Sequence, residues 1–144
     1  MAPTIHASAV LIGPKAVLIR GPSGSGKSRL AWQLLQARLP FARLVGDDRI
    51  HVEARSGRLL VRPAVELAGL IEIHGLGIRR LDYEPVAVAA VVVDLAAAEA
   101  ERLPMADEAM LEGVKLPRLA VKSGADTLFL VLAFLGTAPS GSLT

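Results

Sequence analysis

Residues 15–35 read Lys-Ala-Val-Leu-Ile-Arg-Gly-Pro-Ser-Gly-Ser-Gly-Lys-Ser-Arg-Leu-Ala-Trp-Gln-Leu-Leu. The first six residues form an apolar run of strand length that is rich in β-branched side chains. The apolar positions after residue 28 recur with helical spacing. Between these two segments, residues 21–28 match G-x-x-x-x-G-K-[ST], a pattern in which a loop between a strand and a helix cradles phosphates. The stretch therefore predicts a site for a nucleoside triphosphate.

The fixed residues of this glycine loop (residues 21–28) each have a physical role. Its glycines permit backbone conformations that turn successive N–H groups toward phosphates. Lys27 brings a compact positive charge to the phosphate oxygens, and Ser28 offers a hydroxyl suited to Mg²⁺. The helix that follows adds the positive end of its dipole. The residues expected to bind the nucleotide are Gly21, Pro22, Ser23, Gly24, Ser25, Gly26, Lys27 and Ser28.

The composition fits one domain with its own core. The chain has 144 residues, of which 52% are apolar and only 3% aromatic, so aliphatic side chains must fill that core. A formal net charge of +2 gives no general field for nucleic acid. The absence of cysteine excludes thiolate chemistry and fits a cytoplasmic protein. No stretch reaches 18 apolar residues and no secretory signal is present, so we expect no membrane span.

Turn residues and hydrophobic alternation predict several further elements. We expect strands at 4–12, 15–20, 43–46, 50–54, 59–61, 70–74, 86–95 and 116–121, with 50–61 forming a hairpin. Residues 126–135 fit a helix or a strand, and we favour a helix; residues 96–102 fit a helical turn. Hairpin-connected strands around one glycine loop indicate an α/β domain with a mixed sheet. The predicted domain spans 1–136, followed by a flexible tail at 137–144.

Charged residues near apolar strands are candidates for chemistry. Asp47 and Asp48 follow an apolar strand, where a metal-associated acid or a base could face the phosphates, although such a pair also suits a turn or a helix N-cap. Glu72 lies inside an apolar strand and needs a metal, an arginine such as Arg79 or Arg80, or solvent.

Two further residues are weaker candidates when each is taken alone. His6 lies among apolar neighbours in the first strand, where a histidine is often only a satisfied core or edge residue. Arg102 alone fits a solvated charge.

Together these motifs resemble the catalytic domain of HPr kinase/phosphorylase, a bifunctional serine kinase of bacterial phosphotransfer systems. The resemblance covers roughly residues 4–125, and the chain resembles the short form that lacks the family's N-terminal domain. Residues 71–77 read Ile-Glu-Ile-His-Gly-Leu-Gly and are similar to the family signature E-I-R-G-L-G. Residues 101–104 read Glu-Arg-Leu-Pro and are similar to a D-R-L-G segment that carries an active-site arginine. His6 also precedes Lys27 by the family's spacing.

The resemblance implies a single P-loop-containing kinase domain that uses ATP and Mg²⁺ to phosphorylate a serine of the carrier protein HPr. The implied catalytic residues are His6, Lys27, Asp47, Asp48 and Arg102. The implied metal ligands are Ser28 and Glu72. Asp48 is the favoured acceptor of the serine proton, with Asp47 beside it and His6 in support. Arg102 would stabilise charge on the moving phosphoryl group.

Two departures from the family pattern bear on the reaction's direction. The signature arginine is His74 here, and a second family arginine is Ala125. Because lost positive charge should harm binding of free phosphate more than binding of ATP, we expect a kinase with weak phosphorylase activity. Two rival functions remain: an ATPase or small-molecule kinase with another acceptor, and a non-enzymatic nucleotide-responsive regulator. The resemblance also implies a homo-oligomer, namely a hexamer. From the small net charge and the lack of a long apolar stretch we expect binding to neither nucleic acid nor membrane.

Overall fold

The computed structural model describes residues 3–37, 41–97, 108–122 and 125–137. The elements are β1 (Thr4–Ile12), β2 (Lys15–Arg20), α1 (Lys27–Gln36), β3 (Ala42–Gly46), β4 (Arg49–Arg55), β5 (Arg58–Pro63), η1 (Val65–Leu67), β6 (Leu70–Ile73), β7 (Gly77–Arg80), β8 (Ala87–Leu95), β9 (Glu108–Leu111), β10 (Val114–Val121) and α2 (Thr127–Gly136). Every predicted strand is confirmed to within two residues at each end, and the favoured helix near the C-terminus is confirmed as α2. The elements η1, β7 and β9 were not predicted. Most of the expected turn at 96–102 and of the tail at 137–144 lies outside the described residues.

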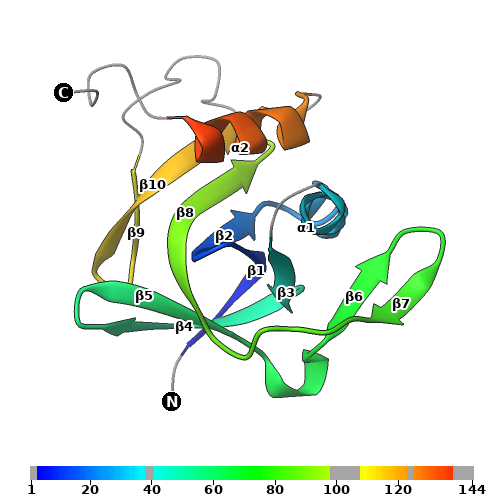
Figure 1. The fold of residues 1–144 in the computed structure, drawn as a ribbon, viewed down its shortest axis with the longest axis horizontal. Coiled ribbons are helices and arrows are strands. Elements are labelled where there is room, and N and C mark those ends of the chain that lie inside the picture. The colour runs from blue at the N-terminus through cyan, green and yellow to red at the C-terminus, as the bar shows by residue number, and fades with distance from the viewer. Residues whose placement is uncertain (1–2, 38–40, 98–107, 123–124, 138–144) are drawn as a thin grey trace.

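Eight strands form one mixed sheet, and β6 and β7 form a separate hairpin. The strand β8 runs parallel to β2 and β10, whereas the other neighbours in the sheet are antiparallel. Because β2 pairs with both β1 and β8, the strands β2, β1, β4, β5 and β8 close into a ring of pairings. Figure 1 shows β8 as a long, strongly curved strand of this ring, while the β6–β7 hairpin projects to one side. The predicted mixed α/β sheet is thus confirmed.

The inside of this ring is filled largely by alanine and small aliphatic side chains. Ala7 and Ala9 of β1, Ala16 of β2, and Ala87 and Ala89 of β8 belong to one buried cluster. A ring of five strands encloses less space than the eight-stranded barrels whose interiors side chains just fill. Small residues therefore suit this core, which accounts for a composition that is apolar but poor in aromatic residues.

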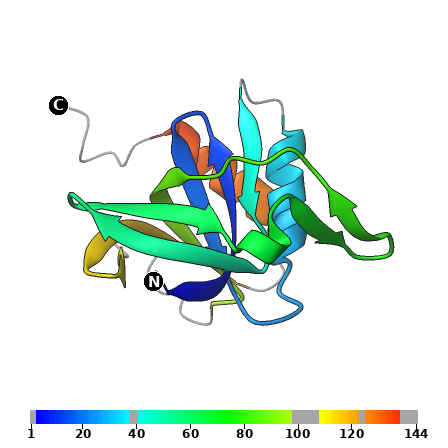
Figure 2. The same ribbon diagram turned by 90° about the horizontal axis from the view of Figure 1, so that it is seen from below.

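Both helices cover the other face of the sheet and build a second core. Leu30 and Leu34 of α1 and Val131 of α2 are buried in one cluster with Val91 and Val93 of β8. Figure 2, seen from below, shows α1 and α2 on the same side of the strands. This core holds α1 against β2, and so it fixes the position of the glycine loop that joins them.

Two hairpins of the sheet turn through pairs of residues with positive φ. The β4–β5 hairpin uses Ser56 (φ 53°) and Gly57 (φ 78°), and the β9–β10 hairpin uses Glu112 (φ 50°) and Gly113 (φ 79°). Positive φ at both central residues defines the type I′ turn, whose twist matches that of the flanking strands. The first hairpin was expected from Ser-Gly, and the second was missed because glutamate is unusual at this position.

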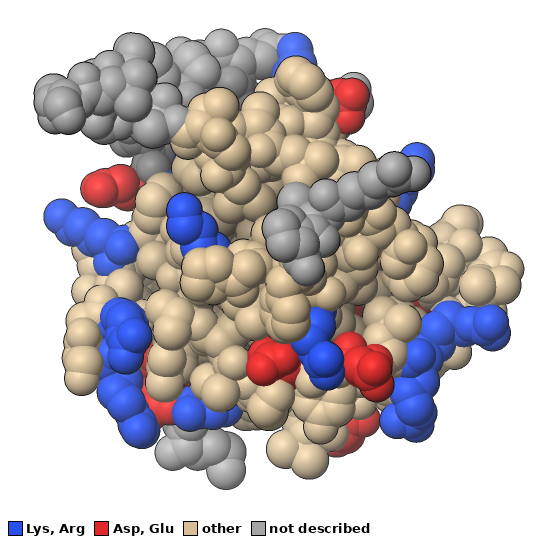
Figure 3. All heavy atoms as spheres, viewed as in Figure 1, with Lys and Arg blue, Asp and Glu red and all other residues tan. Residues whose placement is uncertain are grey.

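On the face drawn in Figure 3, basic and acidic side chains are intermingled, so neither sign of charge dominates it. No helix within the described ranges is long and apolar enough to cross a membrane.

Candidate active site

The glycine loop lies between the end of β2 at Arg20 and the start of α1 at Lys27. Gly24 has φ 80° and Gly26 has φ 100°, conformations that side-chain-bearing residues rarely adopt. The loop therefore delivers its backbone N–H groups and the N-terminus of α1 to one place, as anion binding requires. The ammonium of Lys27 donates to the carbonyl oxygens of Gly21 (2.8 Å) and Pro22 (3.2 Å), so it lies folded over the loop.

One polar atom of the loop points to a missing ligand. The hydroxyl of Ser25 is buried and has no hydrogen-bond partner among the described residues. A buried, unpaired hydroxyl costs free energy, and a nucleotide phosphate would satisfy it. Together with the loop glycines and the ammonium of Lys27, this hydroxyl fits the phosphate chain of a nucleotide.

Asp47 lies directly behind the loop and is only 5% exposed. The hydroxyl of Ser28 donates to both carboxylate oxygens of Asp47, at 2.9 and 2.8 Å, and the hydroxyl of Ser8 donates to Oδ1 at 2.5 Å. The backbone N–H of Glu72 donates to Oδ2 at 3.2 Å. Among the described residues no cationic side chain pairs with Asp47. A buried carboxylate beside a serine hydroxyl offers the hard oxygen atoms that Mg²⁺ prefers, so this set of atoms fits the metal.

Asp48 faces a different environment from its neighbour. Its φ is 72°, and its side chain is 64% exposed. His6 from β1 lies with Nε2 3.0 Å from Oδ1 of Asp48. Because a carboxylate can only accept, Nε2 carries the hydrogen. The backbone N–H of Ala7 also donates to the carbonyl oxygen of Asp48, at 3.1 Å, which ties this residue to β1. The structure thus brings His6 and Asp48 together and separates Asp48 from the buried Asp47.

Glu72 lies on β6 with an exposed side chain, and its hydrogen bond to Asp47 comes from its backbone N–H. It pairs across the hairpin with Ile78, and within the described part of the chain it forms no ion pair with Arg79 or Arg80. No group of three or more acidic or histidine side chains that could hold a metal occurs among the described residues. Arg102 lies outside the described residues.

Sequence reasoning missed two polar features next to the loop. The first is Ser8, which lies two residues after His6 and therefore on the same face of β1. The second is Asp94 of β8, which accepts two hydrogen bonds of 2.8 Å from Arg20 and a shorter one from Arg118. Burial alone would raise the pKa of Asp94, but the hydrogen bonds from Arg20 and Arg118 hold that pKa below its ordinary value. This charge triad (Arg20, Asp94 and Arg118) joins β2, β8 and β10 just before the glycine loop.

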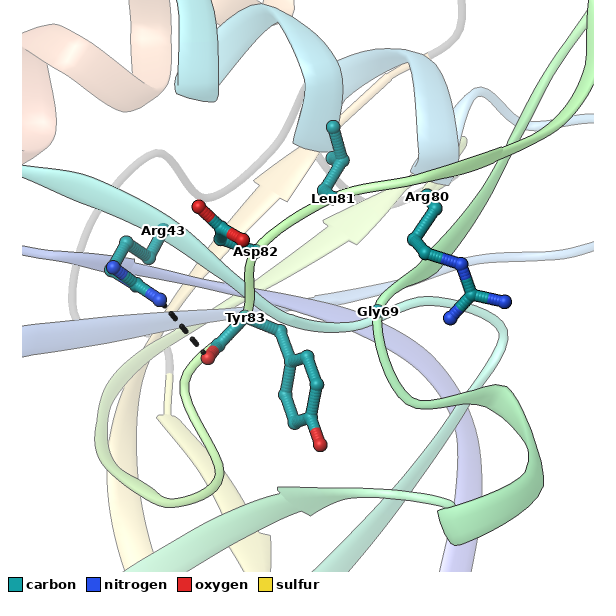
Figure 4. Close-up of a pocket in the computed structure, with 6 residues that line it drawn as sticks. All are labelled: Arg43, Gly69, Arg80, Leu81, Asp82 and Tyr83. Atoms are coloured by element: carbon teal, nitrogen blue, oxygen red, sulfur yellow. Dashed lines mark hydrogen bonds between the residues drawn. The ribbon is translucent and has the colours of Figure 1, made fainter.

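Two open cavities lie among the described residues, and neither includes the loop itself. One, of about 540 Å³, is lined by Thr4, Arg49, His51, Ala64, Glu66 and Leu67. It adjoins the His6–Asp48 pair, because β1 and β4 pair His6 with Arg49. The other, of about 530 Å³, is lined by Arg43, Gly69, Arg80, Leu81, Asp82 and Tyr83. Figure 4 shows Arg43 bonded to the Tyr83 carbonyl oxygen and the Tyr83 ring pointing away from it.

These features define a mixed α/β domain in which Ser28 of the glycine loop bonds the buried Asp47, next to the exposed Asp48. Residues 1–84 match the family model of the HPr Serine kinase C-terminal domain. Since the match covers more than half of the chain, the chain belongs to this family.

Named relatives agree with the family. An HPr kinase/phosphorylase from Streptococcus thermophilus is 34% identical over 147 residues, which is 90% of this chain and 46% of the relative. One from Limosilactobacillus reuteri is 42% identical over 76 residues, 52% of this chain and 23% of the relative. The solved structure of the Hpr(Ser) kinase/phosphatase from Coxiella burnetii superposes with a TM-score of 0.78 at 21% identity, covering 93% of this chain and 94% of that one. The chain therefore spans about half the length of the curated Streptococcus thermophilus relative.

Proposed function

We propose that this chain is the catalytic domain of an ATP-dependent protein serine kinase that phosphorylates the carrier protein HPr of a bacterial phosphotransfer system. The observation that carries the proposal is the exposed Asp48, which is held by His6 and directly follows the buried Asp47 that bonds Ser28 of the glycine loop. Membership of the HPr kinase family and the names of the relatives support the choice of acceptor.

Asp48 would act as the base that orients the serine hydroxyl and accepts its proton. The N–H of His6 occupies Oδ1, which leaves Oδ2 for the incoming hydroxyl. Phosphoryl transfer needs mainly positioning and charge stabilisation, with a carboxylate to align the attacking oxygen. The 64% exposure of the side chain suits an acceptor that is itself a folded protein. His6 would keep the carboxylate in one orientation.

The loop residues would hold the phosphates of ATP. Lys27 would leave the carbonyl oxygens of Gly21 and Pro22 and bind phosphate oxygens instead, while the buried hydroxyl of Ser25 gains a partner. Ser28 would hold Mg²⁺ directly, with Asp47 behind it and Glu72 as the further metal ligand. Bound Mg²⁺ supplies positive charge that neutralises the phosphates during transfer. We assign Arg102 to the charge clamp on the transferred group.

We extend the proposal to a cytoplasmic homo-oligomer with weak phosphorylase activity. Phe129, Leu130 and Phe134 of α2 are exposed, and large apolar side chains that gather on one helix suit an interface between copies. His74 in the β6–β7 turn is exposed, and an imidazole lacks the permanent charge and the bidentate donors of a guanidinium, so phosphate has a weaker partner there than an arginine would give.

The test is to incubate the protein with γ-labelled ATP, Mg²⁺ and the HPr of the same genome. The control acceptor is an HPr in which the target serine is alanine. Label on wild-type HPr alone supports the proposal. Phosphate release without labelled HPr would favour an ATPase or a kinase with another acceptor, and ATP binding without turnover would favour a regulator.

A further inference from the structure

We propose that Ser8 is a positioning residue of the metal–nucleotide site. Its hydroxyl holds the carboxylate of Asp47, and Asp47 in turn orients the hydroxyl of Ser28 for the cation. The inference rests on the proposed function, because it concerns the magnesium–nucleotide complex that such a kinase binds.

The burial of Ser8 makes its hydroxyl costly unless it is bonded. The residue is 0% exposed in the middle of β1, where its neighbours Ala7 and Ala9 belong to the core of the strand ring. A buried hydroxyl without a partner costs about 1–3 kcal/mol. The bond to Oδ1 of Asp47, at 2.5 Å, removes that cost and gives the hydroxyl a defined partner.

The backbone fixes this pairing. The strands β1 and β3 are antiparallel neighbours, and their register places Ala9 opposite Gly46. Asp47 follows Gly46 directly, so its carboxylate meets the side chain of Ser8 at the end of β3. Two buried groups on adjacent strands can hold each other without relying on a mobile loop.

The oxygen distances around Asp47 indicate how the contact between Ser8 and Asp47 affects Ser28. Ser28 has a single hydroxyl hydrogen, and its oxygen lies 2.9 and 2.8 Å from the two oxygens of Asp47. That hydrogen therefore points at Asp47, and the lone pairs of Ser28 point elsewhere. A hydroxyl binds a cation through its lone pairs, so this orientation is the one that metal binding needs. Ser8 and the N–H of Glu72 hold the two carboxylate oxygens in place for it.

The Ser8→Ala substitution should uncouple this chain of contacts. Asp47 would keep Ser28 and Glu72, but Oδ1 would lose its donor from β1 and the carboxylate could rotate. Removing a residue that supports a metal ligand typically lowers metal affinity about 10- to 100-fold. We expect the affinity for the magnesium complex of a non-hydrolysable ATP analogue to fall about tenfold. Affinity for the same analogue in EDTA should not change.

The measurement is isothermal titration calorimetry of the analogue with and without Mg²⁺. Ser28→Ala serves as the positive control. Val10→Ala is the matched control, because it truncates another fully buried side chain of β1 that has no hydrogen-bonding group. It should lower thermal stability and leave the effect of Mg²⁺ on nucleotide affinity unchanged. Should Ser8→Ala fail to fold, Ser8→Cys keeps the volume with a weaker donor, and the same direction is expected.

A double-mutant cycle tests whether Ser8 acts through Asp47. In an Asp47→Asn background the charged carboxylate is gone, so adding Ser8→Ala should cost less than twofold in magnesium-dependent affinity. A full tenfold loss in that background would overturn the proposal. A Ser8→Ala protein with lower thermal stability and wild-type magnesium dependence would overturn it as well, because the contact would then be structural only.

The outcome separates this inference from the proposed function. If Ser8→Ala loses magnesium-dependent affinity and the wild-type protein does not label HPr, the role of Ser8 is kept and HPr is rejected as the acceptor. If the wild-type protein labels HPr and Ser8→Ala keeps the wild-type magnesium dependence, the kinase activity is kept and the role of Ser8 is rejected. A wild-type protein that does not bind the magnesium complex would reject both.

Discussion

Replacing Asp94 by asparagine should destabilise the domain strongly. Asp94 is 14% exposed and bonds Arg20 (31% exposed) and Arg118 (15% exposed). Asparagine keeps the volume and one acceptor oxygen but removes the charge. The two guanidinium groups would then lie side by side without the negative charge of Asp94 between them, at the end of β2 and on β10.

The size of the effect follows from the hydrogen bonds that are lost. Asparagine can keep one of the three bonds that Asp94 accepts, and each bond to a charged group contributes about 1.5–3 kcal/mol. The partial exposure of Arg20 reduces the sum, because solvent can replace part of the interaction. We expect a loss of about 3 kcal/mol, near the lower end for breaking a buried ion pair. For a domain of this size that corresponds to a Tm lower by roughly 10 °C.

A second triad in the same chain provides the matched control. Glu53 also lies between two arginines, Arg55 at 2.8 Å and Arg62 at 2.7 Å, and these hydrogen bonds likewise hold its pKa below the ordinary value. This triad is at the surface, so Glu53→Gln should change the Tm far less. Thermal and denaturant unfolding of both variants measure the difference. Equally small changes in the Tm of the two variants would refute the reasoning that burial makes the Asp94 triad more stabilising than the Glu53 triad.

The pH dependence gives an independent check with a defined sign. A carboxyl group whose folded-state pKa is depressed contributes stability that is present above its unfolded value, about 3.9, and is lost as pH falls through the folded value. The stability gap between wild type and Asp94→Asn should therefore be full at pH 7 and shrink below about pH 4. A gap that widens toward acid would contradict the assignment.

Three further substitutions test other parts of the structure. Lys27→Ala should weaken ATP binding roughly 10- to 100-fold and abolish phosphotransfer, since a charged donor is lost; unchanged calorimetric binding would reject the loop assignment. Glu72→Gln should raise the Mg²⁺ concentration needed for half-maximal activity about tenfold without lowering the Tm, because its exposed side chain pairs with neither Arg79 nor Arg80; full activity at limiting Mg²⁺ would exclude the metal role. Glu112→Asn should raise the free energy of unfolding by about 0.5 kcal/mol in thermal melts, because asparagine suits positive φ in a type I′ turn, and a loss of stability would contradict that turn.

The sequence predicted the elements whose burial leaves a periodic pattern. The strands β2 and β8 bury most of their residues and β1 buries four in a row, so their apolar runs stand out. By contrast, β7 has four exposed residues, and β9 is a four-residue strand with only one buried position. The strand β7 has no buried face, and the inward face of β9 consists only of Ala109 and Leu111, which is too short for a readable pattern. Both are placed by their hairpin partners, which a local pattern does not reveal.

The candidate site was predictable where its chemistry is local. The glycine loop is continuous in sequence, and its fixed residues identify it. The different environments of Asp47 and Asp48 were not predictable, because they depend on the positive φ of Asp48 and on contacts from β1. Ser8 lies 39 residues from Asp47, and Arg20 lies 74 residues from Asp94. Such pairs become visible only when the sheet brings the strands together.

The central claim is that Asp48 acts as the base while Asp47 supports the metal site, and Asp48→Asn tests this claim most directly. Asparagine tolerates the positive φ at this position, so the backbone should stay in place. The measurement compares the rate of label transfer from ATP to HPr with the affinity for the magnesium complex of a non-hydrolysable ATP analogue. We predict that transfer falls at least about 100-fold while that affinity stays at the wild-type value. Wild-type transfer, or a loss of nucleotide affinity that matches the loss of transfer, would contradict the assignment of Asp48 as the base.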